Sequence, residues 1–520
     1  MMKMKKDVFC AGCPLVSRRK FLTGCVGATA AAAVSGLSGI ARAGESEKTR
    51  VKIVFALHGP RQTGPDWPNK GFNFAPVMKW AQAELARRCP GIVFETAMAN
   101  GPKQAQALAD ADKADPPDGY LVWQMNCWNR VAQTFAATGK PVLYVDFLYG
   151  GSGGFLVYTA AFLRQGAKNV AFMASSDIDD VAAAARCFRL CRKGGSPEAF
   201  VQAVSRVRLA RTPKPGDLEC APDPVRTISP EECARRLRET RILAVRDQTR
   251  GALGKIGGIE ILKIPFAELN EAWEKADKDE ARAIAQRWAG DAQRVEGVSE
   301  KTLEESAAMY LAQRALIKRY GARAITVNCL GGFYGNHIHA YPCLGFHQLL
   351  NENLVGGCEC DLRSTSLIVM IQTLTEGRPG YISDPVLDIG RRQIIYAHCV
   401  ATNRPFGPSG PANPYEIVTH SEDRQGASVR SLLPQDYKVT TMQIAPDRKE
   451  ILLHQAKTRG NDFNDRACRT KLCAEPIGDI EKMFRFWDRW GWHRVTFYGD
   501  LKEPARALAD VLGWRMIEEA

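Results

Sequence analysis

Long apolar runs are absent from this chain. Its most apolar N-terminal stretch, 21–40, is rich in Gly, Ala, Ser and Thr, whereas a membrane-spanning helix needs about 20 mostly apolar residues. The stretch follows the pair Arg18-Arg19 and ends at Ala41-Arg-Ala43, which is the charged, apolar and small-residue order of an export signal. We therefore predict a removable signal of the twin-arginine type at 1–43, not an anchor. This signal implies the twin-arginine translocation machinery as a partner and an exported, periplasmic protein.

A disulfide framework is also lacking, although the chain has 16 cysteines. Three of them lie in the predicted signal, and the remaining 13 (16 − 3) are an odd number without regular spacing. Cys358-Glu-Cys360 is too closely spaced for a usual zinc pair, and Cys187 and Cys191 have no second pair to complete a site. We expect mostly buried thiols and no structural zinc.

A concentrated basic patch is missing from the sequence despite a net charge of +13 and a pI near 9.0. Part of the excess belongs to the signal, and the remaining basic residues are mixed with acidic ones, as in 235–241. Such a pattern predicts a solvated basic surface and no nucleic-acid partner.

The first third of the mature chain alternates short apolar runs with helical patterns, and this predicts an N-terminal doubly wound parallel α/β domain at 44–200. The glycine-rich stretch 150–154 lacks the G-x-G-x-x-G spacing, so we expect a flexible loop there and no nucleotide site. The expected strands are 51–57, 92–96, 120–124, 142–146 and 169–173, and the expected helices are 74–88, 102–111, 131–139 and 154–165.

Two further domains are expected after the turn-rich junction at 212–217. A central α/β domain at 201–385 has charged helices expected at 271–292 and 299–320. Past Pro385 the pattern changes to strand-like runs separated by Gly, Pro and Asn. This change predicts a C-terminal β-rich, barrel-like domain at 386–520, with a helix expected near 480–489.

Histidine is almost missing from the N-terminal domain, because seven of the eight histidines follow residue 330. Glu359, Asp384 and His398 each lie at or near the end of a predicted strand. We expect them to converge, since equivalent strand ends of a parallel sheet meet at one edge. An acidic residue there is, taken alone, more often solvated or a helix cap. Taken together, carboxylates and imidazole indicate a site for Mn²⁺ or another divalent cation.

Several motifs from residue 324 onward resemble, in order and spacing, the L-fucose and L-arabinose isomerases, a family of three-domain, metal-dependent sugar isomerases. The resemblance covers essentially the whole mature chain. It is carried by Ile325-Thr-Val-Asn-Cys329, Gly357-Cys-Glu-Cys-Asp361, Ser383-Asp-Pro385, Ala397-His-Cys399 and Gly491-Trp-His-Arg-Val-Thr-Phe-Tyr-Gly-Asp500.

This resemblance implies an aldose–ketose isomerase that acts on a small-molecule sugar through an enediolate. Glu359 and Asp384 match the two acidic metal ligands, which also act as catalytic base and acid. His398 matches a ligating histidine. His493 matches the C-terminal histidine, which either ligates the metal or binds substrate.

Two more residues are predicted to contact substrate. His420 is close enough in the predicted fold to reach the same cleft. Arg494 stands where the family usually has a second histidine, and it would bind an acidic group, which points to a sugar acid or a sulfated sugar. The resemblance also implies a homo-oligomer, a trimer or hexamer, in which Trp67, Trp123 and Trp128 would cover a neighbour's site.

Two other functions fit part of the sequence. A non-catalytic exported carbohydrate-binding protein would use the same scaffold, since fold does not fix function, and Arg494 in place of a histidine favours it. A two-lobed periplasmic solute-binding protein is suggested by the first domain, but it leaves the β-rich region unexplained.

Overall fold

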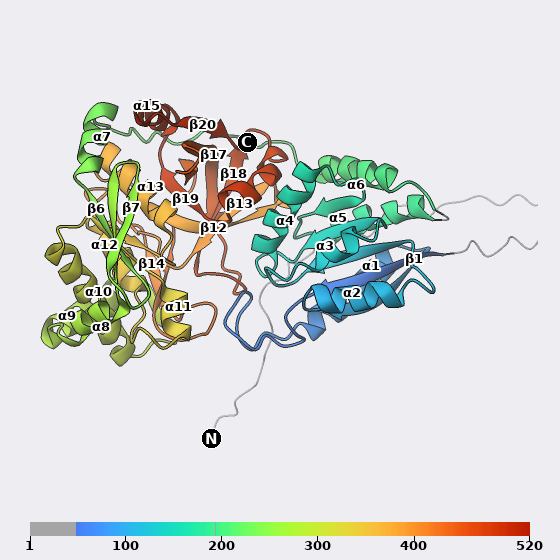
Figure 1. The fold of residues 1–520 in the computed structure, drawn as a ribbon, viewed down its shortest axis with the longest axis horizontal. Coiled ribbons are helices and arrows are strands. Elements are labelled where there is room, and N and C mark those ends of the chain that lie inside the picture. Colours follow the sequence, from blue (N-terminus) through green and yellow to red (C-terminus); the bar gives the residue numbers. More distant parts are fainter. Residues whose placement is uncertain (1–47, 193) are drawn as a thin grey trace, which may run out of the picture. The chain divides into compact units, whose positions relative to one another are not determined.

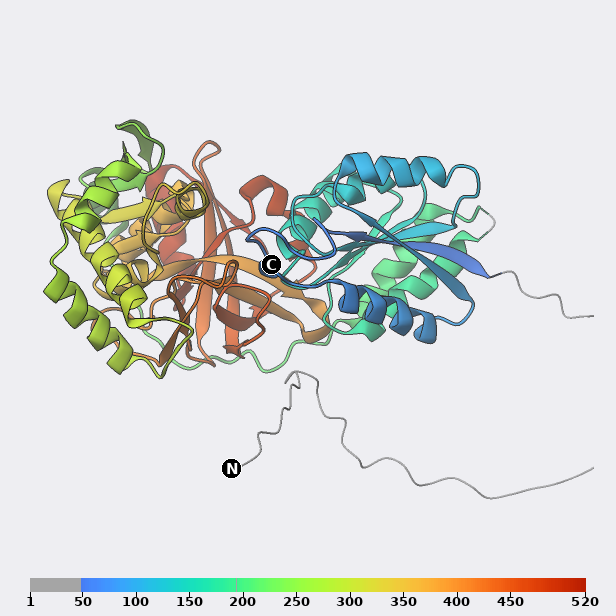
Figure 2. The same cartoon turned by 90° about the horizontal axis from the view of Figure 1, so that it is seen from below.

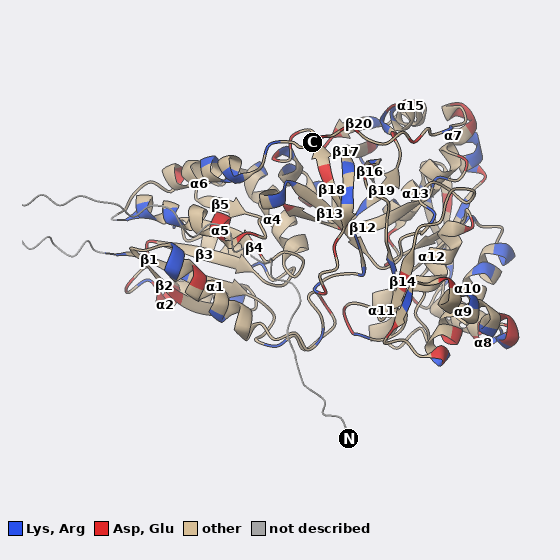
Figure 3. Cartoon of the chain, turned by 180° about the vertical axis from the view of Figure 1, so that it is seen from behind, with Lys and Arg blue, Asp and Glu red and all other residues tan. Residues whose placement is uncertain are grey.

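The computed structural model describes residues 48–192 and 194–520 (Figure 1). The signal predicted at 1–43 lies outside the described residues. None of the described helices is long and apolar enough to cross a bilayer. Basic and acidic residues are interspersed over the described elements (Figure 3).

The N-terminal region is a five-stranded parallel sheet, as predicted, and its strand order is β2-β1-β3-β4-β5. Helix α1 connects β1 to β2 and helix α2 connects β2 to β3, and these two connections run in opposite directions across the sheet. Because such crossovers are right-handed, α1 and α2 lie on opposite faces of the sheet (Figure 2). The elements are β1 (Thr49–Ala56), α1 (Ala75–Arg88), β2 (Ile92–Ala99), α2 (Pro102–Ala111), β3 (Gly119–Gln124), α3 (Val131–Ala136), β4 (Val142–Asp146), α4 (Ser152–Gln165), β5 (Val170–Met173), α5 (Ile178–Ala185), the 3₁₀ turn η1 (Arg186–Cys191) and α6 (Pro197–Arg211).

The strand order reverses between β1 and β3, and ligands of such sheets bind in the crevice at the carboxyl ends of these strands. The loops after β1 and β3 carry Trp67 and Trp128, which line a cavity of about 430 Å³. The glycine-rich stretch 150–154 is not the flexible loop that was expected. It is a close-packed turn into α4, in which a side chain on Gly151 would clash with the backbone of Gln124.

The central region has a second five-stranded sheet of order β11-β10-β6-β8-β7, in which only the pairing of β7 with β8 is antiparallel among the described strands. The helix expected at 271–292 is two helices, because the side chain of Asp277 caps a new N-terminus. The elements are α7 (Pro230–Arg238), β6 (Arg241–Val245), β7 (Gly251–Ile256), β8 (Ile259–Ile264), α8 (Phe266–Glu274), α9 (Lys278–Asp291), α10 (Glu300–Arg319), β10 (Ala324–Val327), α11 (Cys329–Tyr334), α12 (Cys343–Asn351), β11 (Val355–Gly357) and α13 (Leu362–Leu374).

The C-terminal region contains a barrel, in agreement with the β-rich layout predicted. Six strands pair in the order β16-β19-β12-β13-β18-β17, and β17 pairs back with β16 to close the ring, while β20 adds to β17. A smaller sheet joins β15, β14 and β9. The elements are β9 (Arg294–Glu296), β12 (Gly380–Asp388), the 3₁₀ turn η2 (Ile389–Arg391), β13 (Gln393–His398), β14 (Tyr415–Val418), β15 (Ser428–Ser431), β16 (Lys438–Ala445), β17 (Glu450–Asn461), β18 (Thr470–Ile477), the 3₁₀ turn η3 (Lys482–Arg485), α14 (Trp487–Trp490), β19 (Arg494–Tyr498), α15 (Lys502–Leu512) and β20 (Arg515–Glu518).

Two sequence predictions about this region are wrong. The helix expected near 480–489 is only the turn η3 followed by the short α14. The parallel sheet expected to join Glu359 and Asp384 does not exist, because β11 belongs to the central sheet and β12 pairs antiparallel with β13 in the barrel. Helix α13 bridges these layers, since it contacts both β11 and the barrel strand β12.

Arg494 starts β19 and is fully buried, with its guanidinium paired to Glu519. Nη2 donates to Glu519 Oε1 at 2.6 Å, and Nη1 donates to the carbonyls of Gly491 and His493 at 2.8 and 3.0 Å. Glu519 Oε2 also lies 2.9 Å from His454 Nδ1. Burial raises the pKa of Glu519, but Arg494 and His454 lower it to about 2. Both charges of this pair are therefore present at neutral pH.

Replacing Glu519 with Gln should destabilise the protein by about 3–5 kcal/mol at pH 7, because it leaves a buried arginine without its partner. The pKa of Glu519 is depressed, so its contribution is full above about pH 4.3 and is lost as the pH falls towards about 2. When the pH is lowered through this range, the free energy of unfolding measured in urea should therefore fall less for Glu519→Gln than for the parent. The matched control is Glu518→Gln, at the partly exposed neighbour. Equal unfolding midpoints for all three proteins would contradict the buried pair.

Candidate metal centre

Four side chains converge where the central sheet meets the barrel: Glu359, Asp384, His398 and His493. One potential ligand atom from each lies within 4.8 Å of those of the other three. Glu359 follows β11, Asp384 lies in β12, His398 ends β13 and His493 immediately precedes β19. The structure thus brings together all four residues predicted to hold a cation.

The turn after β11 aims Glu359 into the site. Glu359 and Cys360 have φ values of 60° and 53°, a left-handed conformation that non-glycine residues adopt rarely and that concentrates at functional sites. The strand before the turn is packed so closely that a side chain on Gly357 would clash with Thr365 in α13. Glu359 is therefore held by a tight strand end and not by a free loop.

His493 is at the centre of the carboxylates. Its Nε2 lies 3.1 Å from Asp384 Oδ1 and 3.5 Å from Glu359 Oε2, while its Nδ1 lies 2.8 Å from Asp361 Oδ2. A metal-ligating histidine commonly has its second ring nitrogen fixed by such a carboxylate. Asp361 also caps α13 by accepting from Ser364 N at 3.0 Å, so the orienting group is itself anchored.

The pKa values reflect this crowding of charge. Burial lowers the pKa of His493, but the carboxylates around it raise it well above its usual value. Burial also lowers the pKa of His398, but Cys399 and the carboxylates raise it to about 9. Conversely, burial raises the pKa of Asp361, but His493 lowers it to about 2. The pKa of Glu359 is lowered in the same way, because both histidines outweigh its burial.

The donor set fits a divalent cation. Two carboxylates and two imidazoles suit Mn²⁺ and related ions. Nε2 of His398 is buried and has no hydrogen-bond partner among the described residues, which is costly unless a cation or another group satisfies it. Glu359, Asp384, His398 and His493 are the residues that would hold such an ion.

A cavity of about 430 Å³ opens beside these side chains, within the range of small-molecule sites. Glu359, Asp384 and His493 line it. Aromatic rings form another part of the wall: Trp492 lies edge-on to Trp67 and Trp128, with ring centroids 5.3 and 6.1 Å apart. The cavity thus combines polar groups and apolar ring surfaces, as a site for a sugar requires.

Two further acidic residues line the cavity and were missed by sequence reasoning, Asp66 and Glu422. Burial raises the pKa of Glu422 to about 8, so this carboxyl carries a proton at neutral pH. Tyr334 donates to Glu422 Oε2 at 3.1 Å. Burial raises the pKa of Asp66 to about 6, although His58 opposes the shift. Both residues lie in loops, and the tertiary fold alone brings them to the site.

Neither residue predicted to bind substrate lines the cavity. Arg494 is buried and occupied by Glu519, so the prediction that it contacts an acidic substrate is wrong. His420 is 6% exposed, and its Nδ1 lies 3.4 Å from Asp423 Oδ1. Of the tryptophans expected to cover a neighbour's site, Trp67 and Trp128 line the cavity of their own chain, whereas Trp123 is buried in β3.

No protein-family profile matches this chain. A sulfoquinovose isomerase from Clostridium sp. (strain MSTE9) is 26% identical over 229 residues, which are 42% of this chain and 49% of the relative. A second, from Priestia aryabhattai, is 24% identical over 34% of this chain and 42% of the relative. The matched region therefore spans about half the length of these relatives or less.

Among solved structures, a solute-binding protein of an ABC transporter from Bacillus halodurans C-125, with bound myo-inositol, is 13% identical and covers 57% of this chain and 82% of that chain. Its TM-score is 0.18, a value too low to carry an argument. By sequence, the chain is similar to sugar isomerases at low identity.

Proposed function

We propose that this protein is an aldose–ketose isomerase of a small sugar that depends on a divalent cation. The observation that carries the proposal is the convergence of two carboxylates and two imidazoles, three of which, Glu359, Asp384 and His493, line a cavity of about 430 Å³. Its similarity to two sulfoquinovose isomerases supports the reaction class. The burial of Arg494 removes the one feature that favoured a non-catalytic binder.

The reaction moves one proton between adjacent carbons and another between their oxygens. A bound divalent cation would polarise the carbonyl group and offset the negative charge of the enediolate. Glu359, whose pKa is lowered, is ionised at neutral pH; it can accept the proton of one carbon at Oε2 and return it to the neighbouring carbon. Asp384, across His493, is placed to take the second proton from one oxygen at Oδ1 and pass it to the other. Glu422 keeps its proton and can donate a hydrogen bond to a sugar oxygen.

We propose that the substrate carries an anionic group, as the name of the relatives suggests for their sugar. Arg363 also lines the cavity, and its side chain is 44% exposed with one weak ion pair, at 4.0 Å, to Asp447. A guanidinium binds sulfonate, sulfate or carboxylate oxygens through paired hydrogen bonds. Arg363 therefore takes the role that the sequence assigned to Arg494.

The proposal also covers the export of the protein and its oligomeric state. We propose that the twin-arginine signal sends the folded, metal-loaded chain to the periplasm, because an oxygen and nitrogen site selects its ion poorly against copper or zinc. Folding before export would fix the ion first. A trimer or hexamer remains our proposal for the assembled form.

His493→Ala should lower the affinity for Mn²⁺ at least about 100-fold, and Asp361→Asn about 10–100-fold, because the second removes only the orienting carboxylate. His337→Ala, at a histidine that stacks on Phe266, is the matched control.

In the parent, the affinity for Mn²⁺ should rise with pH towards about 9, since His398 must lose its proton to bind the ion. Calorimetric titration with MnCl₂ measures all of these. Parent-like affinity in His493→Ala would exclude it as a ligand.

Glu359→Gln should reduce turnover by at least about 100-fold, since the amide is nearly isosteric but cannot accept the proton. A panel of aldoses and ketoses assayed with Mn²⁺ identifies the substrate first. Glu376→Gln, at an exposed glutamate, should match the parent. Turnover of Glu359→Gln within a few-fold of the parent would remove this residue from the mechanism.

Arg363→Gln should lower kcat/KM about tenfold or more for an anionic sugar and leave neutral sugars within a few-fold, because a hydrogen bond to a charged group contributes about 1.5–3 kcal/mol. Arg282→Gln, on the outer face of α9, is the control. An equal loss for charged and neutral sugars would refute the role of Arg363.

A further inference from the structure

Five cysteines gather directly behind the metal-centre residues. Each is at most 4% exposed, and each belongs to a different segment of the central region or barrel: Cys329, Cys343, Cys358, Cys399 and Cys468. Two of them are chain neighbours of the proposed ligands, since Cys358 precedes Glu359 and Cys399 follows His398. No disulfide joins the cysteines of 48–192 and 194–520.

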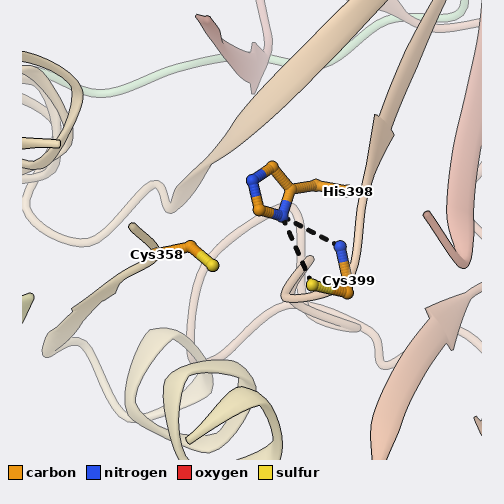
Figure 4. Close-up of side chains that lie close together, drawn as sticks. All are labelled: Cys358, His398 and Cys399. Atoms are coloured by element: carbon orange, nitrogen blue, oxygen red, sulfur yellow. Dashed lines mark hydrogen bonds between the residues drawn. The ribbon is translucent and has the colours of Figure 1, made fainter. Parts of the chain in front are cut away.

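The donor atoms are close enough to share an ion. Sγ of Cys358, Sγ of Cys399 and a ring nitrogen of His398 all lie within 4.8 Å of one another. Cys399 Sγ lies 3.6 Å from His398 Nδ1, and Cys329 Sγ lies 3.5 Å from Cys358 Sγ. The sulfur atom of Cys358 points towards Cys399, and the sulfur atom of Cys399 lies beside the His398 ring (Figure 4).

The 3.6 Å separation of Cys399 Sγ and His398 Nδ1 is the separation expected for two ligands of one tetrahedral ion. Zinc binds sulfur at about 2.3 Å and nitrogen at about 2.0 Å, so neighbouring ligand atoms of a tetrahedron lie roughly 3.5–3.8 Å apart. The Cys399 thiol also interacts with the thiols of Cys343, Cys358 and Cys468. Cys343 and Cys468 lie outside the group whose donor atoms are all within 4.8 Å of one another, so the described residues offer three ligands to one ion.

Apolar packing alone does not account for this arrangement. Thiols that only fill a core would be distributed like Cys89, in the N-terminal region, and Cys233, in α7, each of which contacts a backbone carbonyl. Here the thiols contact one another and a buried imidazole. Sequence spacing gave no sign of the cluster, because its members come from separate strand ends and helix starts.

We propose that Cys358, Cys399 and His398 form a second cation site that takes a thiophilic d¹⁰ ion, Zn²⁺ or Cu⁺. Soft thiolate donors select these ions, whereas the carboxylate-rich centre beside them suits harder ones. The expectation that the chain has no structural zinc is revised accordingly. Binding releases one proton from each ligating thiol, and His398 can bind both ions at once only as an imidazolate, which releases its ring proton as well.

His398 stands between the two sites. Its Nδ1 lies 3.6 Å from Cys399 Sγ and accepts from the Cys399 backbone N–H at 2.9 Å, a contact that an ion bound at Nδ1 would replace; its Nε2 is the buried nitrogen without a hydrogen-bond partner among the described residues. An ion behind the ring would fix the end of β13 and the turn that carries Glu359. The second site would therefore hold two ligands of the first in place, and its occupancy can be measured without any assay of isomerase activity.

Metal content of the full chain tests the proposal. Protein purified in a non-chelating reductant should retain about one Zn²⁺ or Cu⁺ per chain after dialysis, and elemental mass spectrometry distinguishes the two ions. Growth with Co²⁺ should give a thiolate-to-cobalt charge-transfer absorption band. Cys399→Ser and Cys358→Ser should each reduce the retained ion and this band at least tenfold, whereas Cys233→Ser should leave both unchanged.

Three results would overturn the second site. In the first, the parent protein retains no thiophilic ion and shows no cobalt band. In the second, the band is equally intense in Cys399→Ser. In the third, the exported protein has a disulfide between Cys329 and Cys358. Circular dichroism and urea unfolding establish that each variant is folded. If Cys399→Ser fails to fold, Cys358→Ser and the parent spectra still decide the outcome.

Discussion

The contacts of His493 with three carboxylates are the interaction on which the site depends. Glu359, Asp361 and Asp384 place negative charges a few ångströms apart in a largely buried position, and burying charges without compensation is strongly unfavourable. The imidazole supplies the compensating charge in the metal-free protein. Because these carboxylates come from the turn after β11 and from β12, the same contacts join the central sheet to the barrel.

The position of His493 is set by its neighbours in the chain. Arg494 is locked by Glu519 and donates to the His493 carbonyl, and Gln443 donates to the same carbonyl at 3.0 Å. On the other side, Trp492 donates to the Pro385 carbonyl at 2.9 Å. The three consecutive residues thus differ in what they do, since Trp492 places a ring on the cavity wall, His493 supplies a ligand or charge at the centre, and Arg494 is a buried anchor.

Much of the fold was predictable because its signals are local. Apolar runs separated by helical patterns identified the N-terminal sheet, and the change past Pro385 identified the barrel. The four metal-centre residues were also predictable, but the reason given for their convergence was wrong. Glu359 and Asp384 meet across two different sheets, which spacing along the chain cannot distinguish from neighbouring strands of one sheet.

The remaining features depend on tertiary structure. Asp66 and Glu422 lie in loops without a motif, and the thiols behind His398 come from separate segments. Arg494 shows the opposite error. Its place where the resembled family usually has a second histidine suggested a substrate contact, but the side chain is fully buried and paired with Glu519. Only the direction of the side chain separates an anchor from a binding residue.

Anomalous diffraction from crystals soaked in MnCl₂, with data collected just above the manganese absorption edge, locates the cation itself. We expect a strong peak within ligand distance of Glu359, Asp384, His398 and His493, beside the cavity. Saturating Mn²⁺ with no peak at these four side chains, or with a peak only at other residues, would contradict it.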